Sequence, residues 1–147
     1  VLAGLRQISW GHLLAFLLYF IGGYLMYGAV FAAVAAPAEE LQDLQSVTWI
    51  AYLPLILAIV FIGAIVGAPN GGLAIAVSHI PLFSPITMPL RMFATGVPWW
   101  ELLISLVLLY GSMMGLIWLS ARVYRAGLLL YGKKPKISDL VKYAVRG

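Results

Sequence analysis

Three long apolar stretches run along the chain, at residues 13–36, 47–67 and 99–121. The first two contain no charged residue, and the third contains only Glu101, within its first turn. Each stretch matches the roughly 20 residues that an α-helix needs to cross the hydrocarbon core of a bilayer. The pattern predicts an all-α integral membrane protein with three transmembrane helices. Pro54, inside the second stretch, is either a hinge or a proline that neighbouring helices tolerate.

The segment 68–98, between the second and third stretches, follows a different pattern. Pro81, Pro85 and Pro89 recur at a four-residue spacing, and each removes a backbone donor and disfavours a continuous helix. Apolar side chains nevertheless dominate the segment, among them Phe83, Ile86, Met88, Leu90 and Met92. We expect short helical pieces and turns that pack on the end of the bundle, as a proline-broken extracytoplasmic cap or as a re-entrant element buried in protein.

Small residues indicate where transmembrane helices can approach closely. Gly28, Ala32 and Ala36 lie on one ridge of the first helix, and Gly111 and Gly115 form a G-x-x-x-G pattern in the third. We expect helix packing at both sets.

The composition agrees with a membrane protein, because 63% of the residues are hydrophobic, only 10% are charged and the mean hydropathy is +1.01. A chain of 147 residues forms a thin bundle, so we expect an oligomer or a larger complex. It contains no cysteine, which excludes disulfides, thiolate metal sites and cysteine catalysis. Because it begins at Val1 without a signal-peptide pattern, we expect a fragment or a processed chain.

The basic residues gather in the tail 122–147. Seven of the nine Lys and Arg residues lie there: Arg122, Arg125, Lys133, Lys134, Lys136, Lys142 and Arg146. Basic tails are also typical of nucleic-acid binding, but directly after an apolar span the positive-inside rule accounts for them, and we expect no nucleic-acid partner. The tail and residues 37–46 are therefore predicted to be cytoplasmic, and the loop 68–98 to face outside. Residues 139–145 are predicted to form a short amphipathic helix at the inner surface.

Few residues offer chemistry. The interior of the three spans carries no ionisable group, which argues against a self-contained ion pump. His12 and His79 both fall at membrane edges, where we interpret them as structural, and we expect no metal site. No glycine-rich phosphate loop is present, so nucleotide would have to bind elsewhere. Glu39, Glu40 and Asp43 either contact a basic groove on a cytoplasmic partner or simply form the solvated turn that a cytoplasmic loop requires.

Four sequence patterns resemble a known family. They are YLMYGAVFAA at 24–33, S-x-I-P-x-F-S-P-I-x-M-P-x-R at 78–91, VPWWE at 97–101 and ARVYRAGLLLYGKKP at 121–135. Together they are similar to the C-terminal half of an ABC-2 type exporter permease, in the branch of the NatB-like sodium-extrusion permeases. The second and fourth patterns are the specific ones, whereas the other two are common in membrane proteins.

The resemblance implies that these helices are the last three of six, in a multi-pass permease of the bacterial plasma membrane with a cytoplasmic C-terminus. Such a permease exports its substrate by rocking of helices, with ATP and Mg bound by a separate ABC ATPase subunit and not by this chain. It also implies a second permease copy as dimer partner within the lipid bilayer. No catalytic residue is expected here. The first half of such a permease, with its coupling helix, lies outside these residues.

The resemblance also assigns roles to particular residues. The segment 78–91 would form the outer gate or cap, through Pro81, Phe83, Ser84, Pro85, Met88, Pro89 and Arg91. Contacts on the cytoplasmic side would come from Glu39, Glu40, Arg122, Arg125, Lys133 and Lys134. An alternative function is that of a structural or accessory subunit in a respiratory or photosynthetic complex, which also needs no charge inside the spans.

Overall fold

The computed structural model describes residues 8–36, 38, 40–129 and 137–146. These residues form helices and turns, with no strand among them. The helices in chain order are α2 (Trp10–Ala35), α3 (Leu41–Gly67), α4 (Gly72–His79), α5 (Ser84–Ala94), α6 (Trp99–Leu129) and α7 (Ile137–Arg146). The predicted all-α fold is confirmed.

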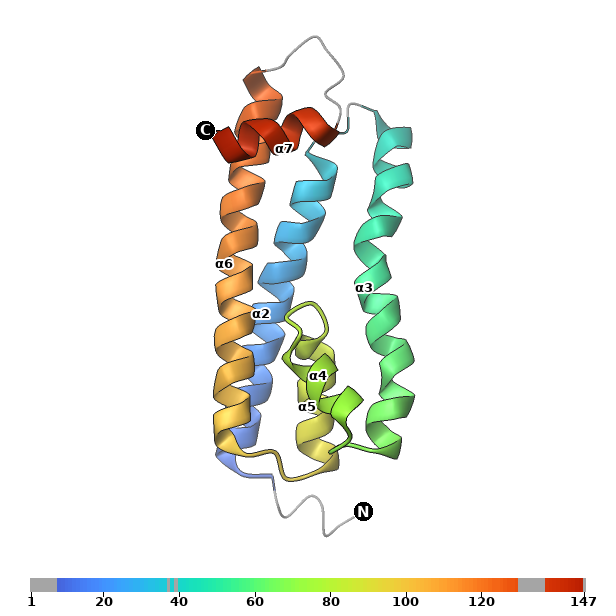
Figure 1. Cartoon of the computed structure of the whole chain (residues 1–147), viewed down its shortest axis with the longest axis vertical. Helices are drawn as coiled ribbons and strands as arrows, with labels where there is room; N and C mark the ends of the chain where they lie inside the picture. The colour runs from blue at the N-terminus through green and yellow to red at the C-terminus, as the bar shows by residue number, and fades with distance from the viewer. Residues whose placement is uncertain (1–7, 37, 39, 130–136, 147) are drawn as a thin grey trace.

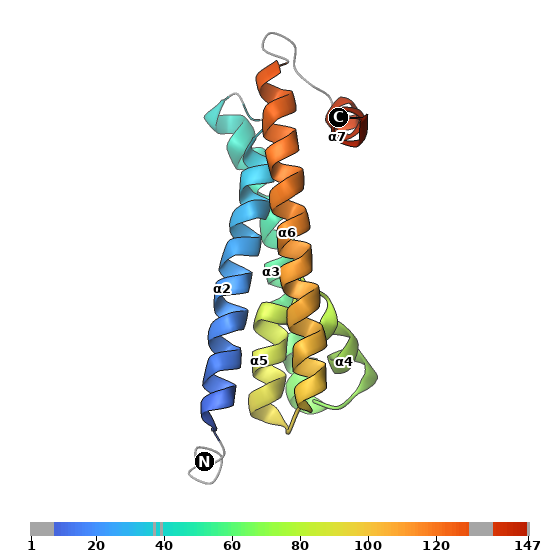
Figure 2. The ribbon, with the colours of Figure 1, turned by 90° about the vertical axis from the view of Figure 1, so that its left-hand side faces the viewer.

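Three of the helices are long and apolar enough to cross a membrane: Trp10–Ala35, Leu41–Gly67 and Trp99–Ala126. They stand side by side, with α2 packed along α6 (Figures 1 and 2). All three helices extend beyond the predicted apolar stretches at one end, because flanking residues can continue a helix outside the hydrocarbon. α3 begins at Leu41 rather than at residue 47 and carries Asp43 in its first turn, where the helix dipole favours an acid.

Helices α4 and α5 form a hairpin at one end of the bundle. The chain leaves α3, runs back between the long helices as α4, turns at residues 80–83 and returns as α5 to the same end (Figure 1). α5 packs against α2, α3, α4 and α6. Phe83 in the turn meets Phe61 of α3 with ring centroids 5.6 Å apart. Within the segment 68–98, α5 is therefore packed among the other helices, whereas α4 keeps an exposed face with Leu73 and Ile75 (Figure 2). Whether the hairpin acts as a cap or as a re-entrant element stays a prediction.

The prolines interrupt the hairpin only once. Pro81 lies in the turn, and Pro85 lies in the first turn of α5, where its missing N–H would have no helical partner anyway. Pro89 lies inside α5 and Pro54 inside α3, and both helices continue through them. A proline in a helix costs one hydrogen bond, and the tertiary contacts around these helices outweigh that cost.

Two close helix contacts involve glycines other than those predicted. A Cβ added at Gly22 would lie 2.8 Å from Cδ2 of Leu109, and one added at Gly23 would lie 2.6 Å from Cβ of Pro85. Both glycines therefore let α2 touch α6 and α5 directly.

Within the part of the chain that the structure describes, the predicted glycines face open space. A Cβ added at Gly28, Gly111 or Gly115 would meet nothing within 4 Å. Ala32 is exposed and Ala36 is half-buried. Packing at this set stays a prediction, and it now concerns contacts with other chains.

The two ends of the bundle differ in what they carry. The first described residues of the chain and the hairpin lie at one end, and the connection from α2 to α3 lies at the other, together with α7 (Figure 1). This alternation agrees with the predicted topology of three spans. Which end faces the cytoplasm stays a prediction.

Candidate functional site

A buried arginine marks the end of the hairpin. Arg91 lies in the last turn of α5 and is only 1% exposed. A charge withdrawn from water in this way requires a partner. The partner is Glu101 in the first turn of α6, which is 8% exposed and whose Oε2 lies 2.5 Å from Nη1 of Arg91. The hairpin is therefore joined to the start of the last span by a buried ion pair.

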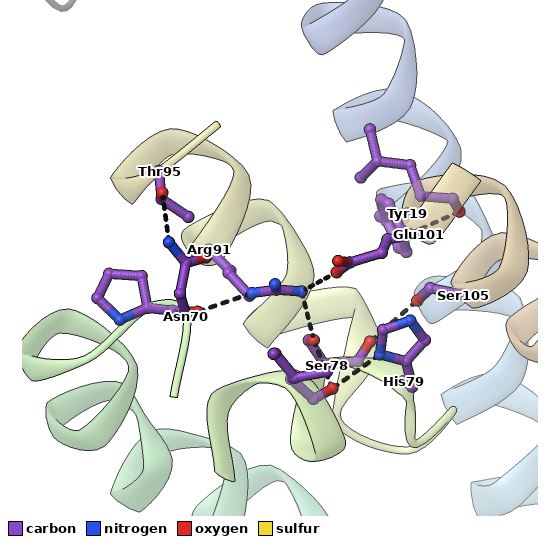
Figure 3. A network of polar contacts seen from close by, with 11 residues as sticks. Tyr19, Asn70, Ser78, His79, Arg91, Thr95, Glu101 and Ser105 are labelled. Atoms are coloured by element: carbon purple, nitrogen blue, oxygen red, sulfur yellow. Dashed lines mark hydrogen bonds and ion pairs between the residues drawn. The ribbon is translucent and has the colours of Figure 1, made fainter. Parts of the chain in front are cut away.

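Arg91 also binds two other segments (Figure 3). Its Nε donates a hydrogen bond of 2.8 Å to the carbonyl oxygen of Pro69, in the turn that precedes the hairpin. Its Nη1 also donates to Oγ of Ser78 in α4, at 3.4 Å. One guanidinium group thus connects the entry to the hairpin, both of its helices and α6.

Buried hydroxyl groups extend this polar network. Oγ of Ser105 in α6 donates to the carbonyl oxygen of Ser78 at 2.9 Å, and Oγ of Ser78 donates to the carbonyl oxygen of Ile75, also at 2.9 Å. Thr87 of α5 donates to the carbonyl oxygen of Phe83 at 2.8 Å. Every buried side-chain nitrogen and oxygen in the described part of the chain has a partner. We call the group formed by Arg91, Glu101, Ser78, Ser105 and the carbonyl of Pro69 the polar network. None of its buried side-chain donors or acceptors lacks a hydrogen-bond partner.

Tyrosines of α2 hold the hairpin and α6 from the other side. The hydroxyl of Tyr27 donates to the carbonyl oxygen of Leu82 in the hairpin turn at 2.6 Å, and the hydroxyl of Tyr19 donates to that of Leu102 at 3.2 Å. At the rim of the same end, Asn70 donates to Oγ1 of Thr95 at 3.3 Å. The hairpin is thus fixed to both α2 and α6 by hydrogen bonds, whereas its described contact with α3 is aromatic.

The structure brings the residues predicted for the outer gate together in this hairpin. Ser84, Met88, Pro89 and Arg91 are buried, and Pro81, Phe83 and Pro85 are half-buried. Met88 joins the apolar core, which consists of Tyr19, Met26, Met88, Leu109 and Met113. Gating itself stays a prediction, but the residues proposed for it all lie in the turn 80–83 and in α5.

Sequence reasoning missed the partner of Arg91. From the sequence alone, Glu101 is placed in the first turn of the third span without a partner, and no role is assigned to Ser78 or Ser105. One signal was present, because Arg91 and Glu101 are the only two charged residues between positions 47 and 121. Two opposite charges alone in so long an apolar segment are expected to meet, because neither is stable unpaired in a membrane.

Three of the residues predicted for cytoplasmic contact, Glu40, Arg122 and Arg125, belong to the ends of α3 and α6 that lie opposite the hairpin (Figure 1). Glu40 precedes α3 and is exposed, as is Arg125 on α6. Arg122 contacts α7, through a hydrogen bond of 2.6 Å from Nη1 to the carbonyl oxygen of Ala144. Glu39, Lys133 and Lys134 lie outside the described residues.

The two histidines take part in local contacts. Nδ1 of His12 lies 2.7 Å from Oγ of Ser9 at the start of α2, and Nδ1 of His79 donates to the carbonyl oxygen of Ile75 at 2.7 Å. Among residues 8–36, 38, 40–129 and 137–146, no three His, Cys, Asp or Glu side chains gather as a metal site. In the polar network, the charged and hydroxyl groups are buried and bonded to one another, and these bonds connect the hairpin to the last span.

Comparisons with known proteins give a consistent result. The family described as "ABC-2 family transporter protein" matches residues 1–122. The uncharacterized protein YhaP of Bacillus subtilis (strain 168) is 28% identical over 131 residues, which cover 88% of this chain and 30% of that protein. The uncharacterized protein MJ1024 of Methanocaldococcus jannaschii is 25% identical over 126 residues, which cover 86% of this chain and 31% of that protein. The chain thus spans about a third of the length of these relatives. No solved structure matches it.

Proposed function

Because the chain belongs to the ABC-2 transporter family and is a multi-pass membrane protein, we propose that it forms the last three spans of an ATP-driven exporter permease. The α4–α5 hairpin is the gate at the outer mouth of the translocation path. ATP and Mg bind to a separate ABC ATPase subunit, with which permeases of this family work, and a second permease copy completes the path. The family match does not favour the alternative of an accessory subunit in a respiratory or photosynthetic complex.

The observation that carries the gate is the ion pair between Arg91 and Glu101. Removing one partner of a buried ion pair costs about 3–5 kcal/mol, because the other charge is left unpaired in a medium of low dielectric constant. The hairpin therefore follows the first turn of α6 in any motion that keeps the pair intact. Its aromatic contact with α3, between Phe61 and Phe83, carries no charge and can change at lower cost than the ion pair.

These two contacts define how the gate works. When the permease changes between inward and outward states, α6 and the hairpin move as one body and the contact with α3 opens or closes. ATP binding to the partner subunit drives the change, since the spans themselves carry no buried group near their middle that could respond to an ion gradient.

The test uses the full-length permease reconstituted in vesicles with its ATPase subunit, with sodium-22 as the transport probe. Arg91→Ala and Glu101→Ala are each expected to lower ATP-driven sodium movement at least tenfold relative to ATP hydrolysis. The affinity of the ATPase subunit for nucleotide should stay unchanged. The double variant Arg91→Glu with Glu101→Arg is the matched control, because it keeps both charges and restores the pair.

The ratio of transport to hydrolysis separates a gate from a purely structural contact. A structural contact would lower both activities together, in proportion to the amount of assembled complex. If single variants keep transport, coupling and complex stability at wild-type levels, the gating role is wrong. If the wild-type complex hydrolyses ATP without moving sodium, the same variants are compared by cross-linking α5 to α3 with and without ATP.

A further inference from the structure

Helix α7 lies outside the residues that the family match covers, and it docks on α6 in a defined way. It lies across the axis of α6 rather than along it, and Figure 2 shows it almost end-on. Arg122 of α6 donates to the carbonyl oxygen of Ala144, which is in the last turn of α7, where helix carbonyls lack an intrahelical donor. The guanidinium carbon of Arg122 also lies 4.0 Å from the centroid of the Trp118 ring. Arg122 therefore caps α7 and fixes its position on α6.

The docking level coincides with the edge of the hydrocarbon core. α6 begins at Trp99 and Trp100, which are 73% and 51% exposed and suit one membrane interface. A helix rises about 1.5 Å per residue and crosses the core of about 30 Å in roughly 20 residues, which reaches the other interface near Trp118 and Arg122. Trp118 is itself 56% exposed. Since α7 crosses α6 at this level, it lies in the plane of the lipid headgroups.

The surface of α7 that α6 leaves uncovered is amphipathic. Ala144 faces the bundle and is 6% exposed, whereas Val141 and Val145 are 57% and 79% exposed. Lys142 and Arg146, each one residue further along, are exposed as well. Two adjacent valines and two basic residues on one helix, at the depth of the headgroups, are typical of helices that lie in a membrane interface.

From this placement we infer that α7 binds anionic phospholipid headgroups. Val141 and Val145 enter the acyl boundary, and Lys142 and Arg146 contact lipid phosphates. Arg125, exposed on α6 beyond Arg122, adds a further positive charge at this end. A water-soluble partner fits less well, because the exposed valines lie at a depth that lipid occupies. The inference concerns lipid binding and does not depend on the proposed transport function.

The experiment follows a fluorescent label on α7 in the full-length permease, in a background without other cysteines. Val145→Cys carries an environment-sensitive fluorophore, and the protein is reconstituted in vesicles of phosphatidylcholine with or without phosphatidylglycerol. The label should report more apolar surroundings in the anionic vesicles than in the neutral ones, and raising the salt concentration should remove this difference. Each basic residue near an anionic surface raises the equilibrium constant for binding to the lipid about fivefold. Lys142→Gln combined with Arg146→Gln should therefore lower the ratio of lipid-bound to released α7 roughly 25-fold.

A label at Gln45 is the matched control. This residue is exposed on α3 near the same end of the bundle, beside acidic rather than basic residues, so its signal should not depend on lipid charge. A separate variant labelled at Val141 tests whether the label at Val145 itself disturbs α7.

Three results would overturn the inference. The labels at positions 141 and 145 could both report water in anionic vesicles. They could report the same apolar surroundings in neutral and anionic vesicles, which would mean insertion without headgroup recognition. They could also become shielded only when the ATPase subunit is added, which would identify a protein partner instead. If the charge variants fail to assemble, the salt response of the wild-type sequence distinguishes the same outcomes.

Discussion

Two arginines at opposite ends of the bundle show how differently the same side chain can act. Arg91 is 1% exposed and is enclosed with Glu101 between the hairpin and α6. Arg122 is partly exposed, lies over the ring of Trp118 and donates to the carbonyl oxygen of Ala144. Both connect a short helix to α6. The first connection is strong because separation leaves an unpaired charge out of water, whereas the second can exchange its partner for water or lipid phosphate.

The largest effect is expected from breaking the buried pair. Arg91→Ala or Glu101→Ala alone should lower the free energy of unfolding by about 3–5 kcal/mol. The measurement is thermal unfolding of the purified protein in one detergent. Arg91→Met combined with Glu101→Leu fills the site with apolar side chains and should recover most of the stability. If the double variant is as unstable as the single ones, the loss comes from packing and not from the unpaired charge.

A second prediction compares glycines on the two faces of α2. Gly23→Ala places a Cβ 2.6 Å from Pro85, so either α2 or the hairpin must shift, at a cost of about 1–3 kcal/mol. Gly28→Ala meets nothing within 4 Å and should be neutral or stabilising by up to about 1 kcal/mol, since alanine favours a helix. Thermal unfolding of the two variants side by side checks this. Equal destabilisation by both would contradict the close contact of α2 with the hairpin.

The hydroxyl groups of the polar network should contribute less. Ser105→Ala removes the hydrogen bond to the carbonyl oxygen of Ser78 and should cost about 1 kcal/mol. Ser46→Ala serves as a control, because its hydroxyl bonds only to the carbonyl of Gln42 in its own helix and is exposed. A cost at Ser46 equal to that at Ser105 would contradict the importance of burial for this network.

The smallest effect on global stability is expected at the other end. Arg122→Ala removes an exposed cation–π contact and a helix cap, which together contribute about 1 kcal/mol. Thermal unfolding should therefore change little, while amide hydrogen exchange within α7 should become faster because its docking is lost. Arg125→Ala, which removes an exposed charge one turn away, should leave exchange in α7 unchanged. Unaltered exchange in the Arg122 variant would mean that α7 docks by other contacts.

The sequence predicted the coarse fold because its signals are local. Uncharged apolar stretches of sufficient length identify membrane spans without any tertiary information, and the three spans were found where the structure has them. The sequence also shows that the segment around Pro81 and Pro85 is not a simple span, because proline disrupts the helix in which it lies. Pro89 and Pro54 show the limit of that rule, because packing kept their helices intact.

The contacts between helices were harder to predict, because they depend on which faces meet. Gly28, Gly111 and Gly115 satisfied a spacing rule but face away from the other helices of this chain, and Gly22 and Gly23 form the close contacts without such a pattern. Arg91 was identified as a candidate, but its pairing with Glu101 required the hairpin to return to the start of α6. The specific NatB-like branch also stays a prediction.

The bond from Arg91 to the carbonyl of Pro69 has a consequence for biosynthesis. Together with the ion pair to Glu101, this bond links the two ends of the segment 69–101 through the guanidinium group of Arg91. While α6 has not yet entered the membrane, Arg91 lacks its carboxylate, and a lone cation is unstable in hydrocarbon. We therefore expect the hairpin to stay at the membrane surface during insertion. It should pack into the bundle only after the first turn of α6 has inserted and Glu101 can pair with Arg91.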